Sequence, residues 1–571
     1  MMRRFSIPKV RVVEKILGQF SLAEKAVFYF LVGLFALSGA LILWQVNDFY
    51  LVEVPTRGGT LTEGVVGNPR FINPVLALSE ADKNLVALVY SGLVRLTPSG
   101  EIENDLAEEV SISKDRLTYT IKIRSDARFH DGTPVTADDV IFTISKITDP
   151  IIKSPRRGNW DGVTVEQVDD QTVSFSLKQA YTPFVYNLTI GIIPKHIWKN
   201  VSDDEFSFSQ FNTLPIGSGP YRVFVVERNS GGIPNFYNLK PYEDGVFIEN
   251  LEFKFYPSED ALIQAYANRE VESFGGISPE KMLDIKRDNS RIVSSPIPRV
   301  FAVFFNQSQS KVLLNKEIRQ ALNIASPKEE IVEKVLGGYG TAISGPLPAG
   351  IYSWTTDIDD MSNENRLAKA KEILAKAGWV ANHDTGTLEK KSGSGKLELS
   401  FSISTGDAPE LQAIAETLRN TWRSLGAKVE VLVYESGELN QSVIRPRQFD
   451  SLLFGEVIGR NADLYPFWHS SQRSDPGLNI ALYANSRADR LLDEARKADN
   501  FEDVEKSYKE FATEIEKDVP AVFLYTPSFL YIVPEKVGGV DISSLAVSQD
   551  RFLSVRDWYI EKDKIWKIFD K

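Results

Sequence analysis

The residue types that most often carry catalysis are few in this sequence, and they are not grouped. The chain of 571 residues contains no cysteine, which excludes disulfides, thiol catalysis and thiolate metal sites. Its four histidines are His130, His196, His383 and His469, and no two of them share a helical turn. We therefore expect no catalytic residue, no metal site and no cofactor.

Short motifs for known reactions are also missing. The sequence has no G-x-S-x-G elbow, no H-E-x-x-H and no complete phosphate loop. Residues 393–396 (Gly-Ser-Gly-Lys) resemble the end of a phosphate loop without its first glycine, so we predict a hairpin tip between Leu388 and Leu397. The acidic pairs Asp138–Asp139 and Asp169–Asp170 are expected to cap a helix and to form a turn.

The composition is that of a large, folded, acidic protein. Hydrophobic residues make up 43% of the chain and charged residues 25%, which is typical of globular domains. The length favours two or more lobes over a single core. The formal net charge of −12 argues against a nucleic-acid partner, because phosphate binding needs a basic face.

Residues 26–46 form an uncharged apolar run, AVFYFLVGLFALSGALILWQV. At ~1.5 Å per residue this run is long enough to cross a hydrocarbon core of ~30 Å. Basic residues outnumber acidic ones before the run, whereas the first charges after it are acidic. The positive-inside rule therefore places residues 1–25 in the cytoplasm and the bulk of the chain outside the cell membrane, as a single-pass protein. The basic residues before the run are Arg3, Arg4, Lys9, Arg11, Lys15 and Lys25.

A cleaved signal peptide is the alternative for this N-terminal region, with Ala36–Ser38 as the small-residue site. The apolar run continues well past that site, which favours an anchor. Residues 47–57 are expected to be a polar tether, and Gly58-Gly59 to begin the folded body.

Hydrophobic periodicity predicts alternating helices and strands in the exported part. The second half in particular has a helix-then-strand rhythm that is typical of an α/β lobe. The main elements expected are strands at 60–66, 301–306, 429–433 and 521–525, a hairpin at 163–178, and helices at 79–91, 136–146, 317–325, 367–377, 411–425 and 501–517.

Several blocks of the sequence match one known family in order and spacing. The first block, Leu106–Ile144, contains Phe-His-Asp-Gly-Thr-Pro at 129–134 and Ala-Asp-Asp-Val at 137–140. Later blocks are Gly-Ser-Gly-Pro-Tyr at 217–221, Ile-Arg-Gln-Ala-Leu at 318–322 and Ala-Gly-Trp at 377–379. From about residue 58 to beyond 525 the chain resembles the family 5 extracellular solute-binding proteins. These are the dipeptide-, oligopeptide- and nickel-binding subunits of ABC importers.

The resemblance implies an α/β fold, namely a two-lobed periplasmic-binding-protein clamshell with an extra inserted subdomain, preceded by one N-terminal transmembrane helix. Lobe I would comprise about 58–300 plus 525–571, with the inserted subdomain at about 75–210, and lobe II about 301–524. In this family the motif at 129–134 belongs to the inserted subdomain, so we expect it to form a structural turn.

The resemblance also implies a function. The protein would work as a monomer without enzyme activity, would capture peptides between its lobes and would deliver them to the permease subunits of an ABC transporter. In peptide-binding relatives an acidic residue of the second lobe holds the peptide's α-ammonium group, and the segment Phe449–Ser470 resembles that region. The implied ligand-binding residues are Asp463 or Glu456 for this charge, Glu63 and Asn68 in the loop after the first strand, and Thr405, Gly406 and Asp407 across the cleft.

Two departures from the family pattern leave the ligand open. Glu456 stands after Gly455 where many relatives have tryptophan, and Ser436 stands where an aromatic residue often precedes Gly437. One alternative is the same fold binding an oligosaccharide, a nickel chelate or a signalling peptide for sensing, although the loss of aromatic residues disfavours sugars. The other is an anchored extracytoplasmic hydrolase, which the missing nucleophile motif disfavours.

Overall fold

The computed structural model describes residues 17–282, 285, 289–349, 361–393, 395–460, 462–498 and 500–569. Most of the predicted basic tail, including Arg3, Arg4, Lys9, Arg11 and Lys15, lies outside the described residues, as does the side chain of Ser436. The chain divides into two compact units, Met1–Arg57 with Tyr559–Lys571, and Gly58–Trp558.

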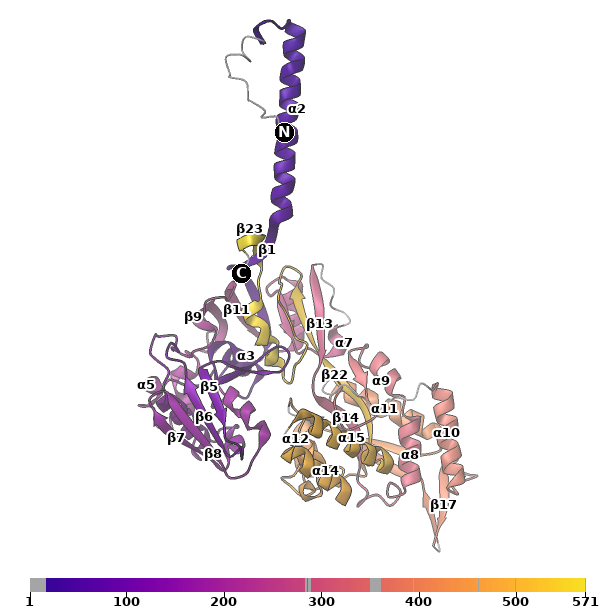
Figure 1. The fold of residues 1–571 in the computed structure, drawn as a ribbon. Coiled ribbons are helices and arrows are strands. Elements are labelled where there is room, and N and C mark those ends of the chain that lie inside the picture. The colour runs from indigo at the N-terminus through magenta and orange to yellow at the C-terminus, as the bar shows by residue number, and fades with distance from the viewer. Residues whose placement is uncertain are drawn as a thin grey trace, which may run out of the picture. The chain divides into compact units, whose positions relative to one another are not determined.

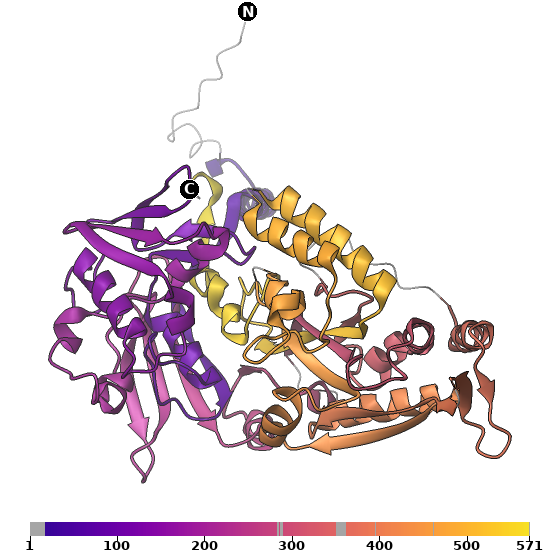
Figure 2. The ribbon, with the colours of Figure 1, turned by 90° about the horizontal axis from the view of Figure 1, so that it is seen from below.

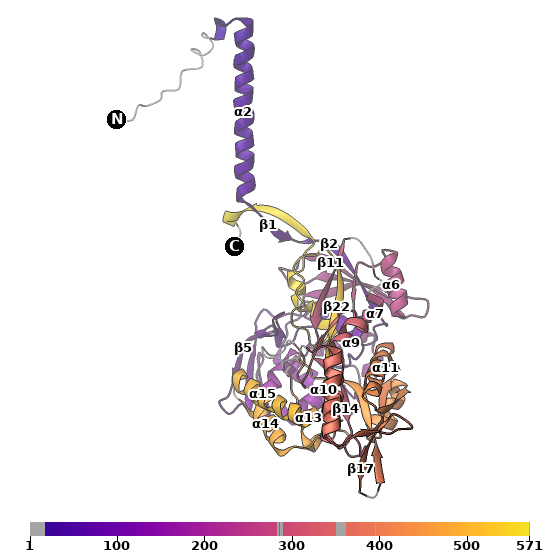
Figure 3. The ribbon, with the colours of Figure 1, turned by 90° about the vertical axis from the view of Figure 1, so that its right-hand side faces the viewer.

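The smaller unit contains a long apolar helix and a two-stranded ribbon. Helix α2 (Leu22–Tyr50) begins at Ser21, whose side chain and main chain exchange capping bonds with Glu24. Within the described part of the chain, α2 is the one helix long and apolar enough to cross a membrane. Strand β1 (Leu51–Thr56) follows α2 and pairs antiparallel with β23 (Glu561–Trp566) (Figure 3). Residues 51–56, expected to be part of a polar tether, therefore form a paired strand.

The larger unit is built on one sheet of 12 strands to which both halves of the unit contribute. Strand β22 (Ala521–Pro534) belongs to both halves, because 521–525 pair with β14 (Arg299–Phe305) and 528–534 pair with β13 (Ser290–Pro296) (Figure 1). The chain thus passes between the halves twice, once between β13 and β14 and once within β22. These are the two crossover segments of the expected two-lobed α/β fold, which is confirmed.

The first lobe has a parallel centre, since β2 pairs parallel with both β11 and β12. The core on one side of its sheet includes Leu262, Tyr266, Phe274 and Ile532, and on the other side α3 packs against the 3₁₀ helix η7. The elements are β2 (Gly58–Val66), α3 (Glu80–Val89), β9 (Tyr221–Arg228), β10 (Pro234–Pro241), β11 (Ile248–Tyr256), α6 (Glu259–Ala267), β12 (Ser273–Gly275), α7 (Pro279–Met282) and η7 (Ser548–Asp557).

A separate four-stranded sheet lies within the range predicted for the inserted subdomain. Its strand order is β5-β6-β8-β7, α4 packs on it, and Tyr119, Trp160, Phe175 and Phe184 form an aromatic cluster in its core. Helix α4 begins with the predicted capping box of Thr136 and Asp139. The elements are β3 (Val94–Leu96), β4 (Ile102–Asn104), β5 (Ala107–Ile112), β6 (Thr118–Ile123), α4 (Ala137–Thr148), β7 (Val163–Asp169), β8 (Thr172–Leu177) and α5 (Lys195–Trp198).

The motif at 129–134 forms a turn, as expected. Asp131 Oδ1 accepts a hydrogen bond from the main-chain N–H of Thr133, and Gly132 has a φ of +87°. The partly buried His130 ring places Nε2 3.0 Å from the carbonyl oxygen of Gly219. A Cβ atom on Gly219 would lie 2.6 Å from the carbonyl oxygen of Leu88, so this glycine permits the chain to lie directly against α3. The motif therefore has a structural role.

The second lobe has three layers. One face of its sheet packs on α8, α9, α10 and α11 through a core that includes Leu322, Ile414, Leu418 and Trp422. The other face packs on α13, α14 and α15 through Leu452, Trp468, Leu491 and Phe511, and Figure 2 shows the gold helices α14 and α15 side by side. The elements are α8 (Lys316–Ala325), α9 (Lys328–Lys334), β15 (Gly340–Ala342), α10 (Asn363–Lys376), β16 (Val380–Ala381), β17 (Leu388–Ser392), β18 (Gly395–Glu398), β19 (Ser400–Gly406), α11 (Pro409–Ser424), β20 (Lys428–Tyr434), α12 (Ser436–Glu438), β21 (Ser451–Val457), α13 (Tyr465–Trp468), α14 (Ser486–Lys497) and α15 (Phe501–Asp518).

Candidate ligand-binding site

Four of the predicted contact residues lie near one edge of the second lobe's sheet. Strands β19 and β21 run parallel, with Ile403 opposite Ser451, so their carboxyl ends meet at the same edge. Thr405 and Gly406 end β19, Asp407 follows in an exposed position, and Glu456 is next to last in β21. In α/β sheets the carboxyl ends of the strands are where ligands bind.

The side chains of Thr405 and Glu456 project from opposite faces of this sheet. Thr405 follows Phe401 and Ile403 in the alternation of β19 and so faces the core of α8 and α11. Its hydroxyl is buried and donates to the carbonyl oxygen of Leu453 at 3.1 Å. Glu456 faces the other core, because it lies opposite Val300 of that core. The structure therefore brings the two strand ends together but not these two side chains.

Glu456 is a buried carboxylate with open hydrogen-bonding capacity. Its side chain is 4% exposed, and neither Oε1 nor Oε2 has a hydrogen-bond partner among the described residues. Burial raises the pKa of the Glu456 carboxyl well above its usual value. A buried carboxylate without a partner is costly, because its charged form has lost water and gained nothing in return. The site is therefore suited to a ligand that supplies a positive charge and N–H donors.

Glu63 has the opposite environment. The carboxylate is fully buried, and Oε1 accepts hydrogen bonds from Arg551 Nε at 3.1 Å and Nη2 at 2.9 Å. Its Oε2 accepts from Tyr531 at 2.9 Å and also from Ser273. Four donors from its own lobe satisfy the carboxylate. Glu63 also lies inside β2, between β11 and β12, and not in the loop after the strand as predicted. Asn68, in the loop after β2, is exposed.

Asp463 already has a cationic partner. Arg496 of α14 donates from Nε to Oδ1 at 3.1 Å and from Nη2 to Oδ2 at 2.5 Å, and its guanidinium lies 3.9 Å from the centroid of the Tyr465 ring. Arg496 and Tyr465 line a cavity of about 710 Å³ together with inserted-subdomain residues such as Tyr181 and Asn187. Because a permanent cation neutralises Asp463, this carboxylate offers less to an incoming ammonium group than Glu456 does.

Arg460 is a residue that the sequence interpretation missed. It follows β21 in the second lobe, and its Nη2 donates to Asp550 Oδ2 in the first lobe at 2.8 Å, while Nη1 donates to Ser544 Oγ at 2.9 Å. Both charged side chains are nearly buried, at 12% and 11% exposure. A cavity of about 250 Å³ lies beside them, lined also by Pro296 and Pro298 at the crossover. Arg460 therefore links the two lobes next to the crossover segment.

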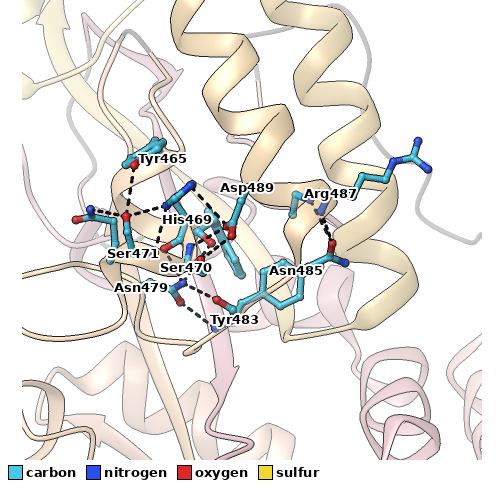
Figure 4. A network of polar contacts seen from close by, with 12 residues as sticks. Tyr465, His469, Ser470, Ser471, Asn479, Tyr483, Asn485, Arg487 and Asp489 are labelled. Atoms are coloured by element: carbon cyan, nitrogen blue, oxygen red, sulfur yellow. Dashed lines mark hydrogen bonds and ion pairs between the residues drawn. The ribbon is translucent and has the colours of Figure 1, made fainter.

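The structure gathers a serine, a histidine and an aspartate in the second lobe, which bears on the hydrolase alternative (Figure 4). The hydroxyl of Ser471 lies 2.7 Å from His469 Nδ1, and His469 Nε2 is 3.9 Å from Asp489 Oδ1. Asp489 instead accepts from the N–H of Ser470 at 2.8 Å and from its hydroxyl at 2.5 Å. The Asp489 carboxylate is thus hydrogen-bonded to Ser470. In a catalytic relay the carboxylate would instead orient the imidazole of the histidine.

The rest of this network ties a loop together. Asn479 donates to the carbonyl oxygens of Trp468, His469 and Tyr483, and accepts from the N–H of Tyr483 at 3.1 Å (Figure 4). The contacts join the end of α13 to the start of α14. We interpret the network as a structural brace for this loop.

His196 and His383 have different surroundings. His196 Nε2 lies 2.7 Å from Asp131, whereas His383 is exposed. Within the described ranges no group of three histidine, cysteine, aspartate or glutamate residues is arranged to hold a metal ion.

Comparison with known proteins shows the family and the fold. Residues 101–479 match the family model of the bacterial extracellular solute-binding proteins, family 5. The oligopeptide-binding protein AppA of Bacillus subtilis is 29% identical over 491 residues, covering 85% of this chain and 89% of the relative. The structure of that protein with a nonapeptide has a TM-score of 0.66 at 27% identity, covering 89% of this chain and 100% of the other. NikZ from Campylobacter jejuni, in complex with Ni(L-His), has a TM-score of 0.67 at 28% identity, covering 88% and 99%. The matched stretch is well over half of the sequence, and the chain belongs to the bacterial extracellular solute-binding proteins of family 5.

Proposed function

We propose that the protein captures peptides between its two lobes and delivers them to an ABC permease in the membrane that holds α2. Family membership supports the receptor role, and the relative AppA binds a nonapeptide in its solved structure. One observation carries the choice of ligand: the carboxylate of Glu456, at the carboxyl edge of the second lobe's sheet, is buried and has no hydrogen-bond partner in the described part of the chain.

A peptide's α-ammonium group has the chemistry that Glu456 lacks. It supplies one positive charge and three N–H donors, and charge-assisted hydrogen bonds of this kind are the strong ones. The other buried carboxylate predicted for the ligand, Glu63, has four donors of its own, and Asp463 has Arg496. Glu456 is therefore the ammonium anchor in this proposal.

Main-chain groups would hold the rest of the peptide. The loop after β2, residues 67–69, in the first lobe and residues 405–407 in the second would offer N–H and C=O groups to an extended chain. Pairing of this kind does not depend on the peptide's side chains, which suits a receptor of broad specificity. Asn68 and Asp407 are exposed and could add polar contacts.

A chelate of a divalent cation is the second candidate, because an open carboxylate also suits a metal complex with a positive charge. NikZ, which is similar over the whole body, binds such a chelate. The same experiment separates the two ligands.

The experiment is to purify the full-length protein gently in nanodiscs, denature it, and identify what it carried by mass spectrometry. A mixture of short peptides with free N-termini is expected. Glu456→Gln should lose them, whereas Glu430→Gln should keep them, because Glu430 is exposed on β20, which β19 separates from the strand of Glu456. An N-acetylated copy of a bound peptide should bind at least tenfold more weakly to the wild type. Retention of peptides by Glu456→Gln would refute the anchor, and recovery of nickel or of a sugar would change the ligand class.

We further propose that α2 anchors the protein as a single-pass helix with Gly58–Trp558 outside the cytoplasm. The support is the apolar, unburied surface of α2 and the charge asymmetry of its flanks. The anchored receptor acts as a monomer, needs no cofactor and catalyses no reaction. Anchoring raises its effective concentration near the permease.

A further inference from the structure

The ribbon that follows α2 is tied to the end of that helix by aromatic and polar contacts. The indole N–H of Trp566 in β23 donates to Asn47 Oδ1 at 3.1 Å, and its ring stacks on Tyr50 with centroids 6.2 Å apart and planes 14° apart. Six residue pairs join β1 to β23, from Leu51 with Trp566 to Thr56 with Glu561. The C-terminal strand of the chain is thus held at the point where the apolar helix ends.

Large apolar side chains remain exposed at this point. Phe49 is 81% exposed, Trp566 43% and Ile568 76%. Along the helix, Tyr50 lies ~6 Å past Val46, the last residue of the uncharged run. The polar headgroup layer on one side of a bilayer is ~5–8 Å thick, so the exposed side chains fall within it when the run fills the hydrocarbon core.

The charges of the ribbon suit the same layer. The two acids that follow the apolar run most closely are paired, Asp48 with Lys564 at 3.9 Å and Glu53 with Lys562 at 3.2 Å. Lys567 is exposed and has no ion-pair partner among the described residues. Over residues 49–56 and 561–568 three lysines are balanced by Glu53, Glu561 and Asp563. Lys567 nevertheless lies next to the exposed Trp566 and Ile568, and aromatic residues with an adjacent lysine are typical of segments in the headgroup layer.

We propose that the membrane-proximal ribbon, residues 49–56 paired with 561–568, inserts its apolar side chains into the lipid headgroup layer. Strand β23 and residues 567–568 then form a second contact with the membrane, beside the helix. Trp566 and Ile568 enter the layer, and Lys567 meets the phosphates of anionic lipids. This inference rests on the proposed anchoring by α2. Lipid is the favoured partner because the ribbon continues directly from the apolar helix.

Because the chain has no cysteine, a nitroxide label can be placed at single positions of the full-length protein. The three labelled variants are Ile568→Cys, Asp563→Cys on the exposed ribbon as an aqueous control, and Val32→Cys within α2. Each is reconstituted in nanodiscs of phosphatidylcholine with 30% phosphatidylglycerol. The collision rates of the label with oxygen and with a water-soluble nickel complex then give its depth by electron paramagnetic resonance.

We expect the label at residue 32 to be deep, the label at 568 to be shallow but severalfold less accessible to nickel than the label at 563, and the label at 563 to be aqueous. Equal nickel accessibility at 568 and 563, with residue 32 deep, would overturn the inference and leave the anchoring intact. An aqueous label at residue 32 would refute the anchoring and with it the inference. Quenching of Trp566 by brominated lipid, taken as the difference between wild type and Trp566→Phe, checks the result without a label on the ribbon, and no such difference would also overturn it.

Discussion

Two buried glutamates, Glu63 and Glu456, should respond in opposite ways to the same substitution. Both side chains are almost inaccessible, but Glu63 is satisfied by four donors and Glu456 by none among the described residues. Glutamine removes the negative charge at either position with little change of shape. We expect Glu456→Gln to stabilise the ligand-free protein at neutral pH and Glu63→Gln to destabilise it.

The magnitude for Glu456 follows from linkage. Burial raises the pKa of the Glu456 carboxyl in the folded protein above its usual value of 4.5. The protein is therefore most stable below pH 4.5, where the carboxyl is neutral, and it loses stability as pH rises through the folded-state pKa. At ~1.4 kcal/mol per pH unit, the loss between pH 4.5 and pH 7 is at most ~3.5 kcal/mol. Glu456→Gln should abolish this pH dependence, and a bound ammonium group should reverse it and release a proton.

The magnitude for Glu63 follows from the ion pair. When Glu63 loses its negative charge, the Arg551 cation stays buried, at 2% exposure, without its counter-ion. Removing one partner of a buried pair costs ~3–5 kcal/mol. Arg551 keeps its bonds to Asn84 and to the carbonyl oxygen of Ser548, so the lower end of that range is expected.

The assay is the midpoint of thermal unfolding of the full-length protein from pH 5 to pH 8, followed by titration calorimetry with a bound peptide in two buffers of different ionisation enthalpy. The wild type should release protons on binding, and Glu63→Gln should bind with unchanged affinity. If Glu456→Gln were less stable than the wild type at pH 7, or Glu63→Gln lost the ligand, the assignment of structural and ligand-binding roles would be wrong.

Three further substitutions test other contacts. Burial lowers the pKa of His130 to about 4. The neutral ring therefore contributes stability above pH 6.5 that is lost as pH falls toward 4, ~3 kcal/mol in all. The His130→Gln variant should unfold at a lower pH than the wild type in acid titrations followed by circular dichroism. Asp550→Asn should loosen the link from Arg460 between the lobes and broaden interlobe distances measured between paired spin labels, and an unchanged distribution would contradict that role. Trp422→Phe removes the hydrogen bond from Nε1 to the carbonyl oxygen of Leu322 at 3.1 Å and should lower the free energy of unfolding by ~1 kcal/mol, measured with urea.

The sequence predicted elements where a local pattern specifies local structure. Leu411, Ile414 and Leu418 recur at helical spacing and stop near Gly426, and α11 ends at Ser424. Val429, Val431 and Val433 alternate, and they lie in β20. Leu388 begins one strand of the predicted hairpin. In each case neighbouring residues determine the result.

The contacts that define the site could not be predicted this way, because their partners are distant in the sequence. Arg551 reaches Glu63 across 488 residues, and Arg460 reaches Asp550 across 90. Nothing local distinguishes a carboxylate that will be satisfied by such partners from one, like Glu456, that will be buried without them. The ligand roles of all seven predicted residues remain predictions, although their contacts favour Glu456 over Asp463 and Glu63 as the charge anchor.

The ribbon of β1 and β23 also determines how the body could be released from its helix. A protease cut at Arg57 would break the covalent connection, yet β1 would stay joined to α2, and β23 would stay joined to the body through Tyr559. A force that separated the body from the helix would act on the amino end of each strand. Because the strands are antiparallel, these ends lie at opposite ends of the ribbon, and the force would load the ribbon in shear. All six residue pairs would share that force at once. A single cut would therefore leave the receptor at the membrane, and shedding would need a second cut or the unfolding of the ribbon.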